Sequence, residues 1–85
     1  MDDKKILEVL NEIFQDIFDD DSLAITAETN QDDIEEWDSL ANINIVFAIE
    51  DEFDIKFDVD DITKMKSVAI IIDEIKKKLA WIGSE

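Results

Sequence analysis

The fold is decided by residues 38–54, which read DSLANINIVFAIEDEFD. Apolar residues recur at helical spacing after Asp38, so the stretch predicts an N-cap at Asp38 and a helix from Ser39 to about Asp54. Two apolar stripes run along this helix: one holds Val46, Ile49 and Phe53, and the other holds Leu40, Ile43 and Phe47. One stripe is enough to pack against a core. The second stripe, which starts beside the helix N-terminus, indicates a surface kept for another purpose.

Longer helices are also predicted on both sides of this stretch. The first runs from about Asp2 to Phe18, with its apolar stripe at Ile6, Leu10, Ile13 and Ile17, flanked by Leu7, Phe14 and Phe18. The last is capped by Ser67 and buries Val68, Ile71, Ile72, Ile75, Leu79 and Ile82. Residues 76–78 are lysines placed near its end, where the helix dipole favours cations.

The connections between these helices are polar. From Leu23 to Asp38 the periodicity fades, and a loop of this length is often functional. Its apolar anchors are Leu23, Ile25, Ile34 and Trp37. Residues 55–59 predict an extended loop with its apolar side chains turned inward, followed by a short helix capped by Asp60 or Asp61 and ending at Lys64. We therefore expect an all-α fold, a single domain over residues 1–85: a four-helix bundle with three longer helices, a short third helix and a long loop between helices one and two.

Composition excludes several classes of function. The chain has 85 residues, with 24 Asp and Glu against 8 basic residues, which gives a net charge of −16. Nucleic acid and anionic membranes would repel such a protein. Without Cys or His, the sequence has no thiol nucleophile, no zinc ligands of the usual types and no imidazole base. The acidic clusters are interpreted as solvated faces, and we expect no metal site and no catalytic residue. The apolar runs are too short to span a bilayer and no signal peptide is apparent, so we expect a cytoplasmic protein.

Ser39 is the residue on which function can be argued. It lies in the first turn of a predicted helix, after an aspartate cap and at the exit of a long loop. A helix N-terminus offers free N–H groups and a partial positive charge, so a phosphate attached there is stabilised. The alternative is that Asp38 caps the helix and Ser39 simply fills its first position.

Context favours the functional interpretation. The run Asp38-Ser39-Leu40, followed by Ile43, Val46, Ile49 and the acidic segment 50–53, resembles the acyl carrier protein family. Residues 62–68 are similar to the family's short third helix and its connection to the fourth. The resemblance extends from the first helix to Leu79. It implies that a holo-carrier-protein synthase, a phosphopantetheinyl transferase, attaches phosphopantetheine from coenzyme A to Ser39, and that Asp38 helps to present this serine. The arm's thiol would hold an acyl group as a thioester, and the chain itself would be no enzyme.

The resemblance also implies a partner face formed by the long loop and the second helix. Its expected partners are acyl-transferring and acyl-modifying enzymes with basic docking surfaces, which a monomer would visit in fatty acid, polyketide or related biosynthesis. The residues expected there are Glu35, Glu36, Leu40, Ile43, Phe47, Glu50 and Asp51. Ala41 and Asn44 stand where members of fatty acid synthesis usually have acids, which favours a specialised carrier.

Three questions stay open at this stage. A peptidyl or aminoacyl carrier would use the same arm. An acidic helical adaptor would bind a basic protein surface and never carry a prosthetic group. For the cargo, the family's interior chain site would correspond to Val46, Ile49, Phe57, Ile62, Met65 and Ile71. Several of these side chains are bulky, so we expect short or polar cargo, with long chains mostly outside.

Overall fold

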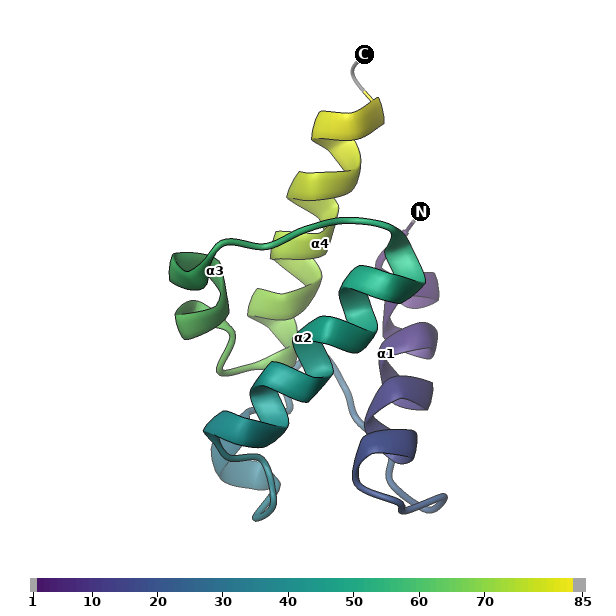
Figure 1. The fold of residues 1–85 in the computed structure, drawn as a ribbon. Coiled ribbons are helices and arrows are strands. Elements are labelled where there is room, and N and C mark those ends of the chain that lie inside the picture. The colour runs from purple at the N-terminus through teal and green to yellow at the C-terminus, as the bar shows by residue number, and fades with distance from the viewer. Residues whose placement is uncertain (1, 84–85) are drawn as a thin grey trace.

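The computed structural model describes residues 2–83, and side chains as far as residue 79. Within this range the chain forms four α-helices, α1 (Asp3–Ile17), α2 (Ser39–Phe53), α3 (Val59–Lys64) and α4 (Val68–Gly83), and a 3-10 helix, η1 (Gln31–Asp33). Helix α1 packs against α2 and α4, and α3 packs against α2 (Figure 1). The predicted all-α bundle, with three longer helices and a short third one, is confirmed.

The helices begin and end where local chemistry directs. The Asp2 carboxylate accepts a hydrogen bond from the Lys5 amide, and α1 starts at the next residue. Helix α2 ends at Asp54, which takes the left-handed conformation at φ 56°. Asp19, just past α1, does the same at φ 50°. Aspartate is among the few residues that tolerate this region, so it replaces the glycine that this chain lacks at both places.

The core lies where α1, α2 and α4 meet. Helix α1 contributes Ile6, Leu10 and Phe14, all fully buried, whereas Ile13 and Ile17 are only partly buried. The predicted stripe is therefore confirmed at Ile6 and Leu10, whereas Phe14 takes the buried position in its second half, where Ile13 and Ile17 were expected. The other buried apolar residues are Ile25, Ile34, Trp37, Ile45, Val46, Ile49, Ile55, Met65, Val68, Ile71, Ile72 and Ile75.

The long loop is tied to the bundle at both sides, as its apolar anchors predicted. Trp37 packs edge-on against Phe14, with ring centroids 5.0 Å apart. The Asn11 side chain accepts a hydrogen bond from the Ile25 amide at 2.8 Å. Farther along, the Gln31 amide donates to the Lys66 carbonyl at 2.8 Å, so the loop also pairs with the connection between α3 and α4.

Three sequence predictions about the second half of the chain are wrong. Val59 does not turn inward but is 75% exposed, because it is the first residue of α3 and faces away from the core. The N-cap of α3 is Asp58, and the Asp61 carboxylate accepts from the Asp58 amide at 3.3 Å. The predicted burial of Ile82 is neither confirmed nor wrong, because this residue lies outside the described side chains.

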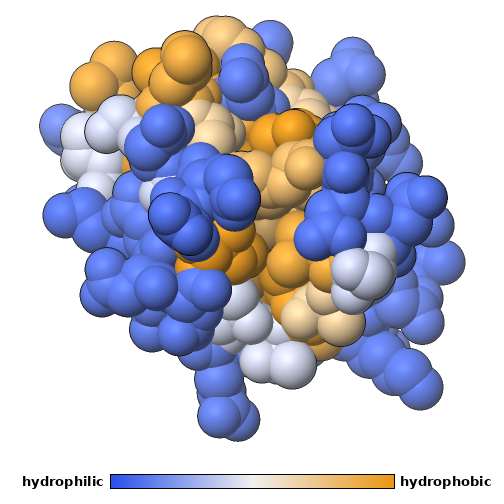
Figure 2. All heavy atoms as spheres, turned by 90° about the horizontal axis from the view of Figure 1, so that it is seen from below, coloured by the Kyte–Doolittle hydropathy of each residue, from blue (hydrophilic) through white to orange (hydrophobic). Residues whose placement is uncertain are grey.

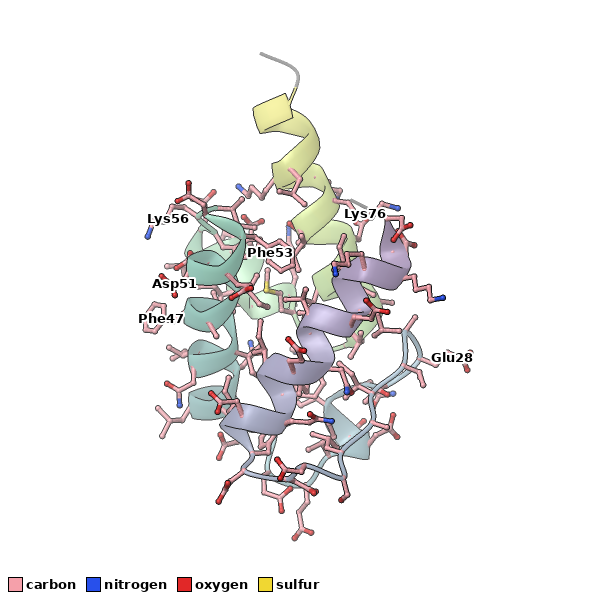
Figure 3. The ribbon with its side chains drawn as sticks, turned by 90° about the vertical axis from the view of Figure 1, so that its right-hand side faces the viewer. Glu28, Phe47, Asp51, Phe53, Lys56 and Lys76 are labelled. Atoms are coloured by element: carbon pink, nitrogen blue, oxygen red, sulfur yellow. The ribbon has the colours of Figure 1, made fainter. Side chains whose placement is uncertain are left out.

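The third error concerns the lysines of α4. Helix α4 continues to Gly83, so residues 76–78 stand more than one turn before its end, beyond the reach of the helix-end charge. They pair with carboxylates instead. Lys76 contacts Asp3 at 2.8 Å, next to the start of α1 (Figure 3), and this hydrogen bond and charge raise the pKa of Lys76. Lys78 contacts Asp61 at 3.5 Å.

Candidate functional site

Ser39 is the first residue of α2, and its side chain is exposed. Asp38 precedes it in an extended conformation, and the Asp38 carboxylate accepts a hydrogen bond from the Ala41 amide at 2.8 Å. The predicted N-cap is thus confirmed. This cap satisfies the Ala41 amide and leaves the amides of Ser39 and Leu40, which have no partner within the helix, at the start of α2.

A groove opens beside Ser39, between α2 and α3. It has a volume of about 700 Å³. Its lining residues, which define what we call the Ser39 groove, are Gln31, Ser39, Asn42, Ile43, Phe47, Val59, Ile62, Thr63 and Lys66. Its apolar lining comes from Ile43, Phe47, Val59 and Ile62, and its polar side chains include the buried Asn42 and the exposed Thr63 and Lys66. Seen from the end of the molecule where α2 begins, apolar atoms reach the surface between polar side chains (Figure 2).

The second apolar stripe of α2 remains uncovered in this structure. Leu40 is 68% exposed and Phe47 60% exposed, with Ile43 between them on the same face. We call these three residues the α2 ridge. Figure 3 shows Phe47 projecting outward from α2, whereas Phe53 points into the bundle. The two stripes therefore separate as the sequence predicted, one in the core and one on the surface.

The acidic residues expected at the partner face differ in their surroundings. Glu35 and Glu36 are exposed just before Ser39, and Asp51 is exposed one turn beyond Phe47. Glu50 is half-buried, and its carboxylate accepts a hydrogen bond from the Phe57 amide at 2.8 Å. Glu50 thus has a structural partner within the chain, whereas Glu35, Glu36 and Asp51 are exposed on the surface.

Asn42 was not among the residues selected from the sequence. It is buried, and its side-chain oxygen accepts a hydrogen bond from the Trp37 indole N–H at 3.0 Å. Its amide group donates to the Ile62 carbonyl at 3.2 Å. A signal was present: Asn42 precedes Ile45 and Val46 by three and four positions, which places a polar residue on the buried stripe. Thr63 and Lys66, on the rim of the Ser39 groove, were also missed.

Two features are absent from the described residues. In that part of the chain, no group of three or more acidic, histidine or cysteine side chains is arranged to hold a metal ion. Among its helices, none combines the length and the apolar character needed to cross a membrane. What the site offers is an exposed hydroxyl, a helix N-terminus and an apolar groove.

Comparison with known structures decides the family. A holo acyl carrier protein from Geobacter metallireducens is 39% identical in sequence, and the match covers 93% of this chain and 91% of that one with a TM-score of 0.82. The chain belongs to the acyl carrier protein family. An acyl carrier protein from Thermotoga maritima also matches, at 29% identity and a TM-score of 0.82 over 93% of this chain and 92% of that one. No protein-family model matches the sequence.

Membership of this family sets the kind of activity to expect. An acyl carrier protein is a carrier and not an enzyme, so the sequence prediction on this point is confirmed. The same structures confirm the predicted fold. The structure places an exposed hydroxyl at the start of α2, with an open groove beside it.

Proposed function

We propose that this chain is a discrete acyl carrier, one domain over residues 1–85, with a phosphopantetheine arm from coenzyme A on Ser39. The observation that carries the proposal is the position of Ser39, exposed at the N-terminus of a fifteen-residue helix and on the edge of the Ser39 groove. The similar protein from Geobacter metallireducens is a holo form, which supports a prosthetic group here too.

The residues around Ser39 fit such an arm. A phosphodiester on the Ser39 hydroxyl would lie at the positive end of the α2 dipole, where free amides stabilise negative charge. Lys66, on the rim of the same groove, adds a cation. Asp38 holds the first turn in place through its bond to Ala41. When attached, the arm supplies a thiol that bears the acyl group as a thioester.

The α2 ridge is the proposed contact surface for partner enzymes. It combines exposed apolar side chains with the nearby carboxylates of Glu35, Glu36 and Asp51, and a chain with net charge −16 attracts basic surfaces over a distance. The expected partners are a phosphopantetheinyl transferase and acyl-transferring and acyl-modifying enzymes. We place the protein in the cytoplasm, as a monomer.

The first residues of α2 favour a specialised pathway. Ala41 and Asn44 leave the beginning of α2 without acids, so the charge on the partner face comes from the preceding loop and from Asp51. A partner would therefore be selected by the α2 ridge, with charge supplied by Glu35 and Glu36 before Ser39 and by Asp51 beyond Phe47. This pattern favours a dedicated partner set over the enzymes of general fatty acid synthesis.

The test is intact-mass spectrometry after incubation with coenzyme A, magnesium and a transferase of broad specificity. We expect the wild-type chain to gain the mass of one phosphopantetheine and Ser39→Ala to gain none. Ser22→Ala is the matched control, because Ser22 is also exposed but lies in the turn after α1. Modification of Ser39→Ala would move the attachment site elsewhere, and an unmodified wild-type chain would favour the adaptor without a prosthetic group.

A further inference from the structure

A second groove lies between α1 and α2, the two helices that Figures 1 and 3 show side by side. We call it the α1–α2 groove, and three apolar and four acidic residues line it. It shares no lining residue with the Ser39 groove. Ala48, the first α2 residue in its lining, stands nine positions after Ser39, or roughly 14 Å along the helix. The two grooves are therefore separate surfaces.

The apolar part of the α1–α2 groove comes from Val9 and Ile13 on α1 and from Ala48 on α2. All three are half-buried, so part of each side chain is accessible to an incoming group. The groove has a volume of about 230 Å³. Sites for small-molecule ligands usually measure about 300–1,000 Å³, so this groove is small for a free ligand. Its size suits a single apolar side chain presented by a larger partner.

Four exposed carboxylates complete the lining, those of Glu12 and Asp16 on α1 and of Asp51 and Glu52 on α2. None of them takes part in the ion pairs of the described side chains. Helix α2 has no basic residue, and the lysines of α1 stand in its first turn, at positions 4 and 5. The negative charge of the groove is thus not balanced by these two helices, and it complements a cationic partner.

These acids occupy positions that are unfavourable for the stability of the chain. Asp16 lies in the last turn of α1, and Asp51 and Glu52 lie in the last turn of α2. The C-terminal end of a helix carries partial negative charge, which repels carboxylates. Glu12 and Asp16 are also four positions apart on one helix, where like charges are destabilising. Charges that oppose folding and pair with nothing inside the chain are expected where function uses them.

We propose that the α1–α2 groove is a docking site for a basic amphipathic segment of a partner protein. An apolar side chain of the segment would enter between Val9, Ile13 and Ala48, and its lysine or arginine side chains would pair with the surrounding carboxylates. A second copy of this chain is a poor occupant, because two molecules of net charge −16 repel each other.

This proposal goes beyond the carrier function and does not require the arm. The α1–α2 groove includes no residue of the α2 ridge, so a partner docked there leaves Ser39 and the ridge accessible to other enzymes. One protein can then stay attached while others visit the arm. Asp51 borders both surfaces, and for that reason it stays unchanged in the test.

The probe is a synthetic helical peptide with a leucine stripe flanked by lysines, titrated into the full chain at physiological salt, which screens non-specific attraction. Amide chemical shifts should change most at Val9, Ile13 and Ala48 and little at Ile43. A second peptide with the same lysines and serine in place of leucine should bind more weakly, because it lacks the apolar anchor. Ser39→Ala should bind the first peptide like wild type.

The groove is tested by Glu12→Gln combined with Glu52→Gln. Calorimetric titration should show a loss of affinity of about fivefold or more, since two exposed charge pairs are removed. The matched control combines Glu28→Gln with Asp32→Asn, two exposed acids of the long loop that lie outside both grooves (Figure 3 labels Glu28). It changes the net charge equally and should alter affinity by less than about twofold.

Two further measurements separate docking from a structural role. The variant with Glu12→Gln and Glu52→Gln should keep Tm at or above that of wild type, because it removes charges that repel one another. Ala48→Gln fills the apolar part of the groove without changing the charge and should weaken binding as well. Circular dichroism checks that each variant is folded, and if Ala48→Gln does not fold, the leucine-to-serine peptide still tests the apolar contact.

The outcomes are distinct from those of the proposed function, because peptide binding is read on a chain without the arm. Groove variants that bind like wild type, equal binding of the two peptides, or shifts centred on the α2 ridge would each overturn the docking site. A lower Tm for the variant with Glu12→Gln and Glu52→Gln would assign these acids to stability instead. Shifts at Val9 and Ile13 that depend on protein concentration without peptide would identify a second copy as the occupant and overturn the proposal.

Discussion

Replacing Asn42 with alanine should destabilise the protein far more than its position near the surface would indicate. The variant removes the 3.0 Å bond from the Trp37 indole and the 3.2 Å bond to the Ile62 carbonyl. Trp37 is 2% exposed, so its N–H is left without water, which costs about 1–3 kcal/mol. Ile62 is half-buried and its carbonyl still accepts from the Met65 amide, so it contributes at the lower end of that range.

The two contributions give a loss of about 2–3 kcal/mol in the free energy of unfolding, which for a domain of this size lowers Tm by on the order of 10 °C. Urea unfolding followed by circular dichroism at fixed ionic strength measures it. Asn44→Ala is the control, because Asn44 is exposed on the same helix and its replacement should change stability by less than about 0.5 kcal/mol. If Asn42→Ala also falls within that limit, the hydrogen bonds described at Asn42 do not hold α3 and the loop together.

Three further predictions concern groups on the surface of the molecule. Phe47→Ala should leave the free energy of unfolding within about 0.5 kcal/mol of wild type, since Phe47 is mostly exposed. The same variant should lower kcat/KM of the transferase, because it removes an apolar contact from the partner face. An unchanged kcat/KM would show that Phe47 is not part of that face. Because the net charge is −16, salt should screen the self-repulsion of the folded chain. Tm measured by differential scanning calorimetry should therefore rise with added sodium chloride and rise further with magnesium. An unchanged Tm would show that self-repulsion is small. Asp3 raises the pKa of Lys76 above its ordinary value of 10.5, so the stabilisation by this pair is complete below that pH and is lost as the pH rises through the higher pKa of the folded state. The difference in Tm between wild type and Lys76→Gln should accordingly be constant at neutral pH and shrink in strong alkali; a difference that persists there would assign the effect to packing.

Local patterns predicted the fold well because they are sufficient for helix boundaries. Asp38 followed by an amphipathic run fixes the start of α2, and the predicted range of α1 differs from the observed one by a single residue at each end. The same local signals were weaker around α3, because several neighbouring aspartates could each serve as the N-cap. The alternation of apolar residues in 55–59 also gave no sign that Val59 would face solvent.

The site was predicted only in part, for a different reason. Ser39 and the α2 ridge are recognisable within one helix, but the Ser39 groove requires the placement of α3 against α2. Asn42 illustrates the limit most clearly. Its two partners lie in different elements, and a polar residue on a buried stripe indicates only that some partner exists.

The pairing of the long loop with the connection before α4 has a consequence for protein synthesis. Gln31 and Lys66 are joined by a backbone hydrogen bond, as are Thr29 and Val68. These contacts join residues more than thirty positions apart, so they close a long segment of chain. A nascent chain that has not yet reached Val68 cannot form them, although Trp37 and Ile25 can already contact α1. We therefore expect the segment that leads into Ser39 to be held on one side only until the start of α4 has been made.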